Sequence, residues 1–272
     1  MIFSPKSAKM GVENVKFGDF CGFFVIFDKK IGERDEPRKG RRKMRLLITG
    51  FMPFGGEEIN PSWEAVRALP EKILEYELTK MLIPVVFGEA AEMVIAEAEK
   101  IRADAVLCIG QAGGRAEICP ELVGINLKNA TIPDNAGNQP GDEPIAEGGD
   151  AAYFSTLPVR KIADAISAAG IPARLSYSAG AYVCNELLYS LLRHFEGGQN
   201  DGKNGREDRV EGGQNDRENA RKKAGENTRK TRVGFIHVPY IPEQGKTPSM
   251  SLDDIKNALT IAIKNLDTEE KL

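Results

Sequence analysis

The sequence predicts an α/β fold: a single domain in which a mixed, largely parallel sheet lies between two layers of helices, giving a three-layer α/β/α arrangement. The first observation is that, from Met44 onward, apolar runs of strand length alternate with segments of helical periodicity. The second is that 272 residues with 41% hydrophobic content can bury one full core. In such sheets functional side chains gather where strands end, so a site is expected there.

The expected strands are short apolar runs separated by helical segments. They are Leu46–Thr49, Thr79–Pro84, Ala105–Ile109, Leu122–Leu127, Ala173–Tyr177 and Val233–Val238. The first expected helix begins at Asn60 and Pro61, because asparagine caps helices and proline suits the first helical position. The other expected helices are Glu89–Ile101, Val159–Ala169, Ala181–Phe195 and Leu252–Leu266.

Two segments fall outside this alternation. Residues 1–43 end in a charged run before Met44, so we expect an extension of uncertain order and an ordered domain at 44–272. The aromatic residues of Val15–Phe27 leave open a hairpin or a partner-binding arm. Residues 196–232 are polar, contain EGGQND twice and offer almost no apolar side chain, which predicts a disordered surface insert. A charged tether for a partner is the alternative.

Composition argues against several classes of protein. The 40 acidic and 37 basic residues nearly cancel, so nothing indicates nucleic acid or an anionic membrane as a partner. The four cysteines form no CxxC pair and have no histidine at metal-ligand spacing, so no metal site is expected. Scattered thiols are typical of a reducing compartment, which predicts a cytoplasmic protein. The apolar run Phe20–Phe27 is too short to span a bilayer.

Only two histidines are candidates for a general base. His237 ends the apolar strand of GFIHVPYIPEQ, and the following Val-Pro ends regular pairing, so the imidazole is expected to emerge at a strand terminus. A structural histidine is the alternative. His194 stands at the polar end of a helix beside Arg193, where we expect it to contact the terminal carbonyls or solvent.

The candidate nucleophile is Cys184, in SYSAGAYVCNELLYSLL. The preceding Ser-Ala-Gly is typical of a turn and a helix is expected from Tyr182, so the thiol falls in the first helical turn. Unpaired backbone N–H groups and the helix dipole favour a thiolate there. A buried, inert cysteine is the alternative. Cys108, on an apolar strand, is the better candidate for inert core, and Cys21 lies in the extension.

A third group would hold the imidazole in one tautomer. Glu121 follows the Gly-rich loop of GQAGGRAEICPELVGIN and precedes an expected strand, so its carboxylate can approach the same end of the sheet. An ordinary glutamate at a strand edge is the alternative. The glycines of this loop do not form GxGxxG and no P-loop lysine follows, which argues against phosphate binding.

Three stretches together resemble the pyroglutamyl peptidase I family, also called pyrrolidone carboxyl peptidase. They are MRLLITGFMPFGGEEINPSWEA, then GQAGGRAEICPELVGIN followed by IPDNAGNQP, and finally SYSAGAYVCN with GFIHVPYIPEQ. The resemblance covers about Met44–Leu266 apart from the low-complexity insert, so it implies a cysteine peptidase domain at 44–272.

The resemblance implies a cysteine exopeptidase that removes an N-terminal pyroglutamyl residue from peptides through an acyl-enzyme. Cys184 matches the nucleophile, His237 the general base and Glu121 the acidic orienting residue. The pyroglutamate pocket would fall on Phe51, Phe54, Ile132, Tyr182 and Val183, with Gln111 beside the ligand. No metal or organic cofactor is implied, and relatives often assemble as dimers or tetramers, which predicts a homo-oligomer.

The chain departs from the family at three positions. Members commonly carry Ser or Thr where this chain has Cys119, a basic residue at Leu122, and Arg at Thr131, near the catalytic centre. These departures leave two alternatives open. One is a cysteine amidase with another small-acyl preference. The other is a catalytically silent α/β binding protein in which Cys184 and His237 do not meet.

Overall fold

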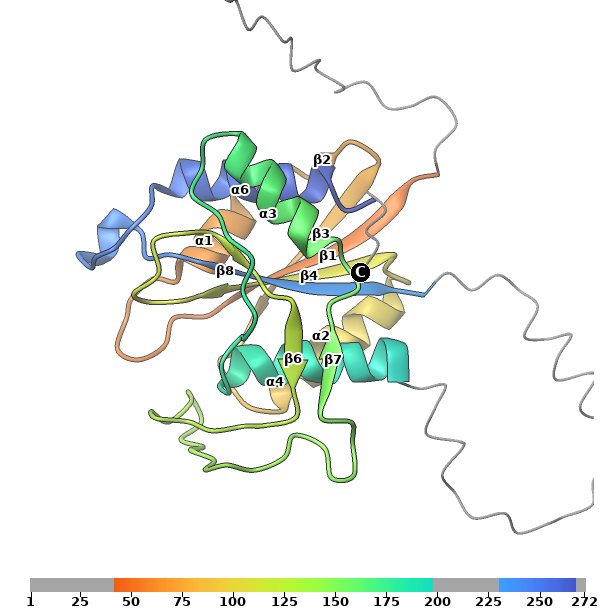
Figure 1. Ribbon diagram of the computed structural model, residues 1–272, viewed down its shortest axis with the longest axis vertical. Coiled ribbons are helices and arrows are strands. Elements are labelled where there is room, and N and C mark those ends of the chain that lie inside the picture. The colour runs from red at the N-terminus through yellow and green to blue at the C-terminus, as the bar shows by residue number, and fades with distance from the viewer. Residues whose placement is uncertain (1–41, 198–229, 268–272) are drawn as a thin grey trace, which may run out of the picture. The chain divides into compact units, whose positions relative to one another are not determined.

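A six-stranded sheet lies at the centre of the described residues, 42–197 and 230–267, of the computed structural model (Figure 1). The strands follow the order β2-β3-β1-β4-β8-β5. The four inner strands are parallel to one another, whereas each of the two short edge strands is antiparallel to its inner neighbour. Their bounds are β1 Met44–Phe51, β2 Lys72–Ile73, β3 Tyr76–Ile83, β4 Ala105–Gln111, β5 Cys119–Pro120 and β8 Arg232–Val238. The predicted mixed, largely parallel sheet is confirmed.

Helices cover both faces of this sheet (Figure 1). One apolar core joins the sheet to α1 (Pro61–Arg67), α3 (Val159–Ala168) and α6 (Leu252–Lys264). A second core joins the other face to α2 (Glu89–Lys100) and α4 (Val183–Leu192). Short π and 3-10 turns follow at Arg193–Gly197 and Pro242–Gln244. The three-layer α/β/α class is therefore confirmed, with each expected helix present within a few residues of its predicted bounds.

Two expected strands differ in the structure. The run Leu122–Leu127 holds only β6 (Val123–Ile125), which pairs with β7 (Ala152–Phe154) in a separate two-stranded sheet. The run Ala173–Tyr177 forms no strand and contributes only isolated bridges beside β5. Pro120 explains the second difference. Proline has no backbone N–H, so one of the hydrogen bonds that would join this run to β5 cannot form.

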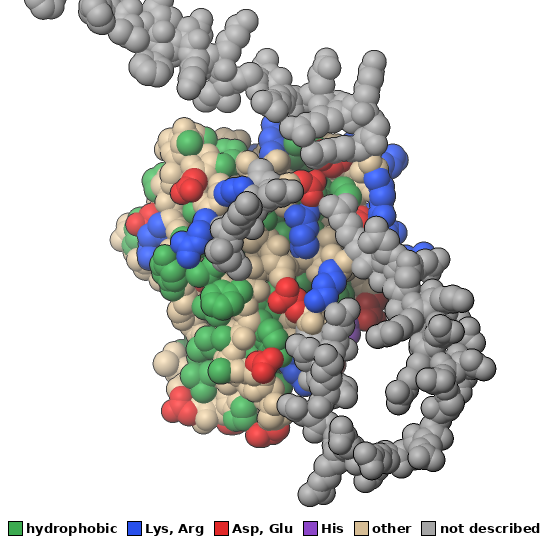
Figure 2. Space-filling view, turned by 45° about the vertical axis from the view of Figure 1, so that its right-hand side comes forward, with side chains coloured by type: hydrophobic (Ala, Val, Ile, Leu, Met, Phe, Trp, Pro, Cys, Tyr) green, Lys and Arg blue, Asp and Glu red, His purple; other side chains and the backbone are tan. Residues whose placement is uncertain are grey.

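The described residues include only a few positions of the amino-terminal extension and of the insert. Residues 1–41 and 198–229 lie outside them, so the predictions for 1–43 and 196–232 stay predictions. Among the helices in the described ranges, none is long and apolar enough to cross a membrane. On the face shown in Figure 2, acidic and basic side chains both occur, separated by polar and hydrophobic ones.

The carboxyl ends of β4 and β8 and the amino end of the antiparallel strand β5 meet at one edge of the sheet. Gly110 in β4 is in register with His237 in β8, and Cys119 of β5 pairs with the same histidine from the other side. Because these strands are buried on both faces, their ends are held rigidly by the two cores. This edge is where the sequence predicts a site.

The loop after β1 is fastened to this edge by Asn60. Its side-chain oxygen accepts from the backbone N–H of Ser62 at 3.1 Å and from the Ser62 hydroxyl at 2.8 Å, while its amide donates to the carbonyl of Met52 at 3.0 Å. Ser62 Oγ in turn accepts from the N–H of Phe51 at 2.9 Å. The cap of α1 thus also fixes the last residue of β1.

We expect Asn60→Ala to lower the free energy of unfolding by about 2 kcal/mol, because it removes a helix cap and leaves buried polar groups unpaired. The matched control is Ser251→Ala, which removes the exposed cap of α6 and is expected to cost about 1 kcal/mol. Urea denaturation of both variants measures the difference. An Asn60→Ala variant no less stable than Ser251→Ala would contradict this account.

Candidate active site

The three candidate catalytic residues come from separate elements that meet at the sheet edge. His237 is the penultimate residue of β8, Glu121 follows β5 directly, and Cys184 is the second residue of α4. Cys184 and His237 line one cavity. The two side chains therefore border the same space at the sheet edge.

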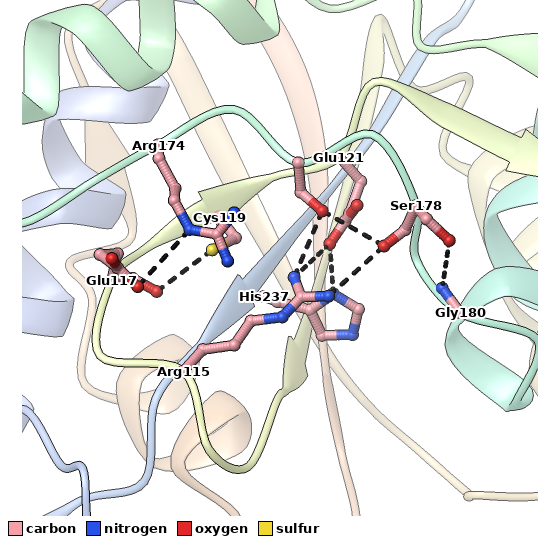
Figure 3. A network of polar contacts seen from close by, with 9 residues as sticks. Arg115, Glu117, Cys119, Glu121, Arg174, Ser178, Gly180 and His237 are labelled. Carbon is pink, nitrogen blue, oxygen red and sulfur yellow. Dashed lines mark hydrogen bonds and ion pairs between the residues drawn. The ribbon is translucent and has the colours of Figure 1, made fainter.

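Glu121 and His237 form a buried pair (Figure 3). Oε1 of Glu121 lies 2.7 Å from Nδ1 of His237, and the two residues are 0% and 4% exposed. The N–H of Glu121 donates to the carbonyl of Phe235 at 2.9 Å, which ties the glutamate backbone to β8. A carboxylate at Nδ1 holds the ring in the tautomer whose Nε2 is free to accept a proton.

Arg115 is a residue that the sequence analysis did not single out. Its guanidinium donates to the same Oε1 of Glu121 at 2.9 Å, and also to Ser176 Oγ at 3.3 Å and to the carbonyl of Ser178 at 3.4 Å. Figure 3 shows the guanidinium beside the Glu121 carboxylate and the His237 ring. It supplies the positive charge that a fully buried carboxylate requires. The sequence signal that could have identified Arg115 is its position in the Gly-rich loop, six residues before Glu121.

Cys184 lies in the first turn of α4, as predicted. The first bonds of that helix run from the N–H groups of Asn185 and Glu186 to the carbonyl of Tyr182, at 3.0 Å and 3.1 Å. The N–H groups of Val183 and Cys184 precede this ladder. They therefore form a positive helix end next to the sulfur, suited to a developing oxyanion.

The expectation of a thiolate favoured by the helix end is corrected by the structure. Burial raises the pKa of the Cys184 thiol to about 12, and the nearby Glu121 and Cys108 add to this increase. The half-buried sulfur is packed against the sheet, and the loss of hydration there opposes the effect of the helix end. At neutral pH the thiol is thus protonated, and its activation requires that a base removes the proton.

Gly110 allows this close packing. A Cβ built at Gly110 would lie 2.6 Å from Phe235 Cζ and 3.1 Å from the sulfur of Cys184. Any side chain there would displace either the aromatic ring or the thiol. Glycine at this position therefore lets α4 bring Cys184 against the carboxyl end of β4, beside His237.

A cavity of about 250 Å³ opens beside the thiol. Its walls are mostly apolar and include the rings of Phe54 and Tyr182, whose centroids lie 6.3 Å apart. Phe87 does not line the cavity but meets the Tyr182 ring edge-on at 5.4 Å. The predicted binding residues Phe51, Phe54, Gln111 and Tyr182 all line it, together with Asn60, Val85, Ala112, Gly113, Arg115, Ala179, Gly180, Cys184 and His237.

Two predicted binding residues do not line this cavity. Val183 is 0% exposed and packs into the core under α4. Ile132 is 44% exposed on a neighbouring loop. That loop is tied to the cavity wall, because Tyr182 donates its hydroxyl to the carbonyl of Pro133 at 3.1 Å and Asn135 donates to the carbonyl of Pro53 at 2.9 Å.

The three positions that depart from the family have different surroundings, and none of them lines the cavity. Cys119 is buried, and its thiol donates to the carbonyl of Glu117 at 3.4 Å. Leu122 is buried in the core, so an apolar side chain suits its surroundings. Thr131 is exposed and its carbonyl accepts from Gln139 at 3.2 Å. In this chain the cationic side chain that lines the cavity is Arg115.

The remaining thiol and histidine in the described ranges have other surroundings. Cys108 is fully buried, and burial raises the pKa of its thiol to about 12, in agreement with an inert core cysteine. Cys21 lies outside the described residues. His194 Nε2 lies 2.8 Å from Oε1 of Glu99 in α2, rather than at the helix carbonyls. Within the described ranges, no three His, Cys, Asp or Glu side chains gather as metal ligands.

The raised pKa of Cys184 predicts how its alkylation depends on pH. The rate with iodoacetamide should rise about tenfold per unit between about pH 7 and about pH 9, because only the thiolate reacts. Mass spectrometry of the Cys184 peptide over time measures this rate, and the Cys108 peptide of the same sample serves as the unreactive control. A rate that is already constant near neutral pH would contradict the assignment.

The comparisons with known proteins agree with one another. A family profile described as pyroglutamyl peptidase matches residues 44–205 and 219–269. The pyrrolidone-carboxylate peptidase of Staphylococcus saprophyticus is 44% identical over 225 residues, which are 81% of this chain and 92% of that protein. The pyrrolidone-carboxylate peptidase of Thermococcus kodakarensis is 43% identical over 224 residues, which are 81% of this chain and 95% of that protein.

A solved structure shows the same likeness. The crystal structure of pyroglutamyl peptidase I from Bacillus amyloliquefaciens aligns with a TM-score of 0.66 at 40% identity, and the alignment covers 82% of this chain and 96% of that one. Because family profile, sequences and structure all match over most of the chain, this protein belongs to the pyroglutamyl peptidase family of cysteine peptidases.

Proposed function

We propose that this protein hydrolyses the amide bond after an N-terminal pyroglutamyl residue of peptides, through an acyl-enzyme on Cys184. The observation that carries the proposal is the cavity that holds both Cys184 and a histidine paired with a buried glutamate. A thiol next to an oriented imidazole is the arrangement of a nucleophile with its base. Family membership supports the reaction class.

The reaction follows from the positions of these groups. His237 accepts the thiol proton of Cys184 at Nε2, and the sulfur attacks the pyroglutamyl carbonyl carbon. The N–H groups at the start of α4 stabilise the resulting oxyanion. The imidazolium then donates its proton to the leaving amine as the C–N bond breaks. Water, deprotonated by His237, attacks the thioester, and the released thiolate takes the proton back.

The pyroglutamyl specificity is supported by the walls of the cavity. A five-membered lactam is flat and mostly apolar, and the rings of Phe51, Phe54 and Tyr182 offer flat apolar surfaces of matching size. Polar partners for the ring N–H and ring carbonyl discriminate against proline, which lacks the carbonyl. Ile132 remains a proposed contact, since its loop is tied to the cavity wall.

We place the protein in the cytoplasm and propose that it forms homo-oligomers. Free thiols at Cys108, Cys119 and Cys184 support a reducing compartment. The near balance of charges, with a net of -3, gives no support for nucleic acid or a membrane as a partner. The homo-oligomer rests on the family resemblance. Peptides with an N-terminal pyroglutamate are the proposed substrates.

Hydrolysis of a fluorogenic pyroglutamyl coumarin amide tests the proposal. Cys184→Ser should lower kcat/KM at least about 1,000-fold, because a hydroxyl cannot replace the thiol with this base. The matched control is Cys119→Ser, which changes a neighbouring thiol to a residue common in the family and should keep wild-type activity. Wild-type protein that leaves the amide intact, or a Cys184→Ser variant that hydrolyses it normally, would refute the function.

A second expectation concerns Arg115. Arg115→Met should lower kcat about 10- to 100-fold, because Glu121 loses its countercharge and no longer holds the His237 ring. Arg115→Lys should recover part of the loss. The control is Arg174→Met, which removes a nearby arginine that pairs with Glu117 instead, at 3.6 Å. Equal rates for Arg115→Met and Arg174→Met would show that Arg115 does not support the triad.

A further inference from the structure

A chain of hydrogen bonds leads from the segment after β8 into the cavity. Gln244 donates from Nε2 to Oε1 of Gln111 at 2.9 Å and to Oε2 of Glu57 at 3.2 Å. Its own Oε1 accepts the backbone N–H of Ile241 at 3.1 Å. Gln111 lines the cavity, whereas Gln244 does not. Gln244 therefore touches the cavity only through Gln111.

The orientation of the Gln244 amide is fixed at both of its ends. The N–H of Ile241 can only donate, so it requires the amide oxygen. An ionised Glu57 can only accept, so it requires the amide nitrogen. Lys246 binds the other oxygen of Glu57, and this hydrogen bond lowers the pKa of that carboxyl, which keeps it ionised. Neither partner would tolerate a flipped Gln244.

This fixed orientation determines what Gln111 presents to the cavity. Because Gln244 offers an N–H, Gln111 must turn its oxygen toward Gln244. The Nε2 of Gln111 is then the end that remains for a ligand, and within the described ranges it donates to no other residue. The cavity thus presents a hydrogen-bond donor at this wall, and an acyl group with an acceptor at the matching position is favoured.

We propose that Gln244 is a positioning residue that fixes the polarity of Gln111 and so selects acyl groups with a ring carbonyl. The inference rests on the proposed function, since the pyroglutamyl ring supplies that carbonyl. Gln244 acts through Gln111 and Glu57 anchors it. The loop after β1 and the segment after His237 are joined by the same bonds, so the donor is held in register with the catalytic histidine.

The test replaces the donor of Gln244 with an acceptor. In Gln244→Glu the carboxylate can donate to neither Gln111 nor Glu57, so Gln111 turns its nitrogen toward it and presents its oxygen to the substrate carbonyl. The new charge also repels Glu57, which the uncharged Gln244→Met avoids. The kcat/KM for pyroglutamyl coumarin amide should fall about 10- to 100-fold, mainly through KM, because two acceptors then face each other. Gln244→Met, which removes the bonds without adding charge, should cost about tenfold. The control is Glu243→Gln, a change at the exposed residue next to Gln244, which should leave kcat and KM unchanged.

A double-mutant cycle separates this role from a structural one. Once Gln111→Leu has removed the donor, adding Gln244→Glu or Gln244→Met should lower kcat/KM by less than about threefold more. A residue that only stabilises its segment would instead give losses that multiply. Iodoacetamide alkylation of Cys184 at the wild-type rate in each variant shows that the nucleophile is intact.

The outcomes distinguish the two proposals. An active wild type with multiplicative losses, or with Gln244 variants that keep wild-type kcat/KM, overturns the inference about Gln244 alone. A wild type that does not hydrolyse the pyroglutamyl amide overturns the proposed function and, with it, the inference. If Gln244→Glu does not fold, Gln244→Met and its cycle with Gln111→Leu decide the question.

Discussion

The buried carboxylate of Glu121 is the group on which the arrangement of the site depends. A charge at 0% exposure is costly unless it is paired, and here one oxygen meets both the His237 ring and the Arg115 guanidinium. Three segments are fixed by this requirement: the Gly-rich loop, the turn after β5 and the end of β8. Orientation of the imidazole is thus a consequence of how the carboxylate is neutralised.

Close packing at the same edge sets the state of the thiol. Gly110 leaves room for Cys184 against β4, and the resulting burial raises the pKa of that thiol to about 12. A protonated thiol is unreactive until His237 removes its proton, so reactivity is tied to the oriented base. The same edge carries Gln111, whose partner Gln244 follows His237 by seven residues in the chain. The nucleophile at the start of α4, the base at the end of β8 and Gln111 at the end of β4 therefore gather at the same edge of the sheet.

Much of the fold was predictable because its signals are local. Long apolar runs such as those of β1, β4 and β8 are typical of strands buried on both faces, and Asn60 with Pro61 marked a helix start. The run Ala173–Tyr177 failed because its partner strand contains Pro120, and pairing depends on both strands. Nothing in the sequence of Ala173–Tyr177 itself indicates that its partner cannot donate this hydrogen bond.

The sequence by itself determined the fold class, the family and the candidates Cys184, His237 and Glu121. Strand ends, helix starts and motifs can be recognised from residues that are close together in the sequence. Only the tertiary structure decided that Arg115 neutralises Glu121, that burial raises the pKa of the Cys184 thiol, and that Val183 packs into the core. It also decided the bonds from Gln244 to Gln111. These properties depend on desolvation and on contacts between distant segments, which no local pattern encodes.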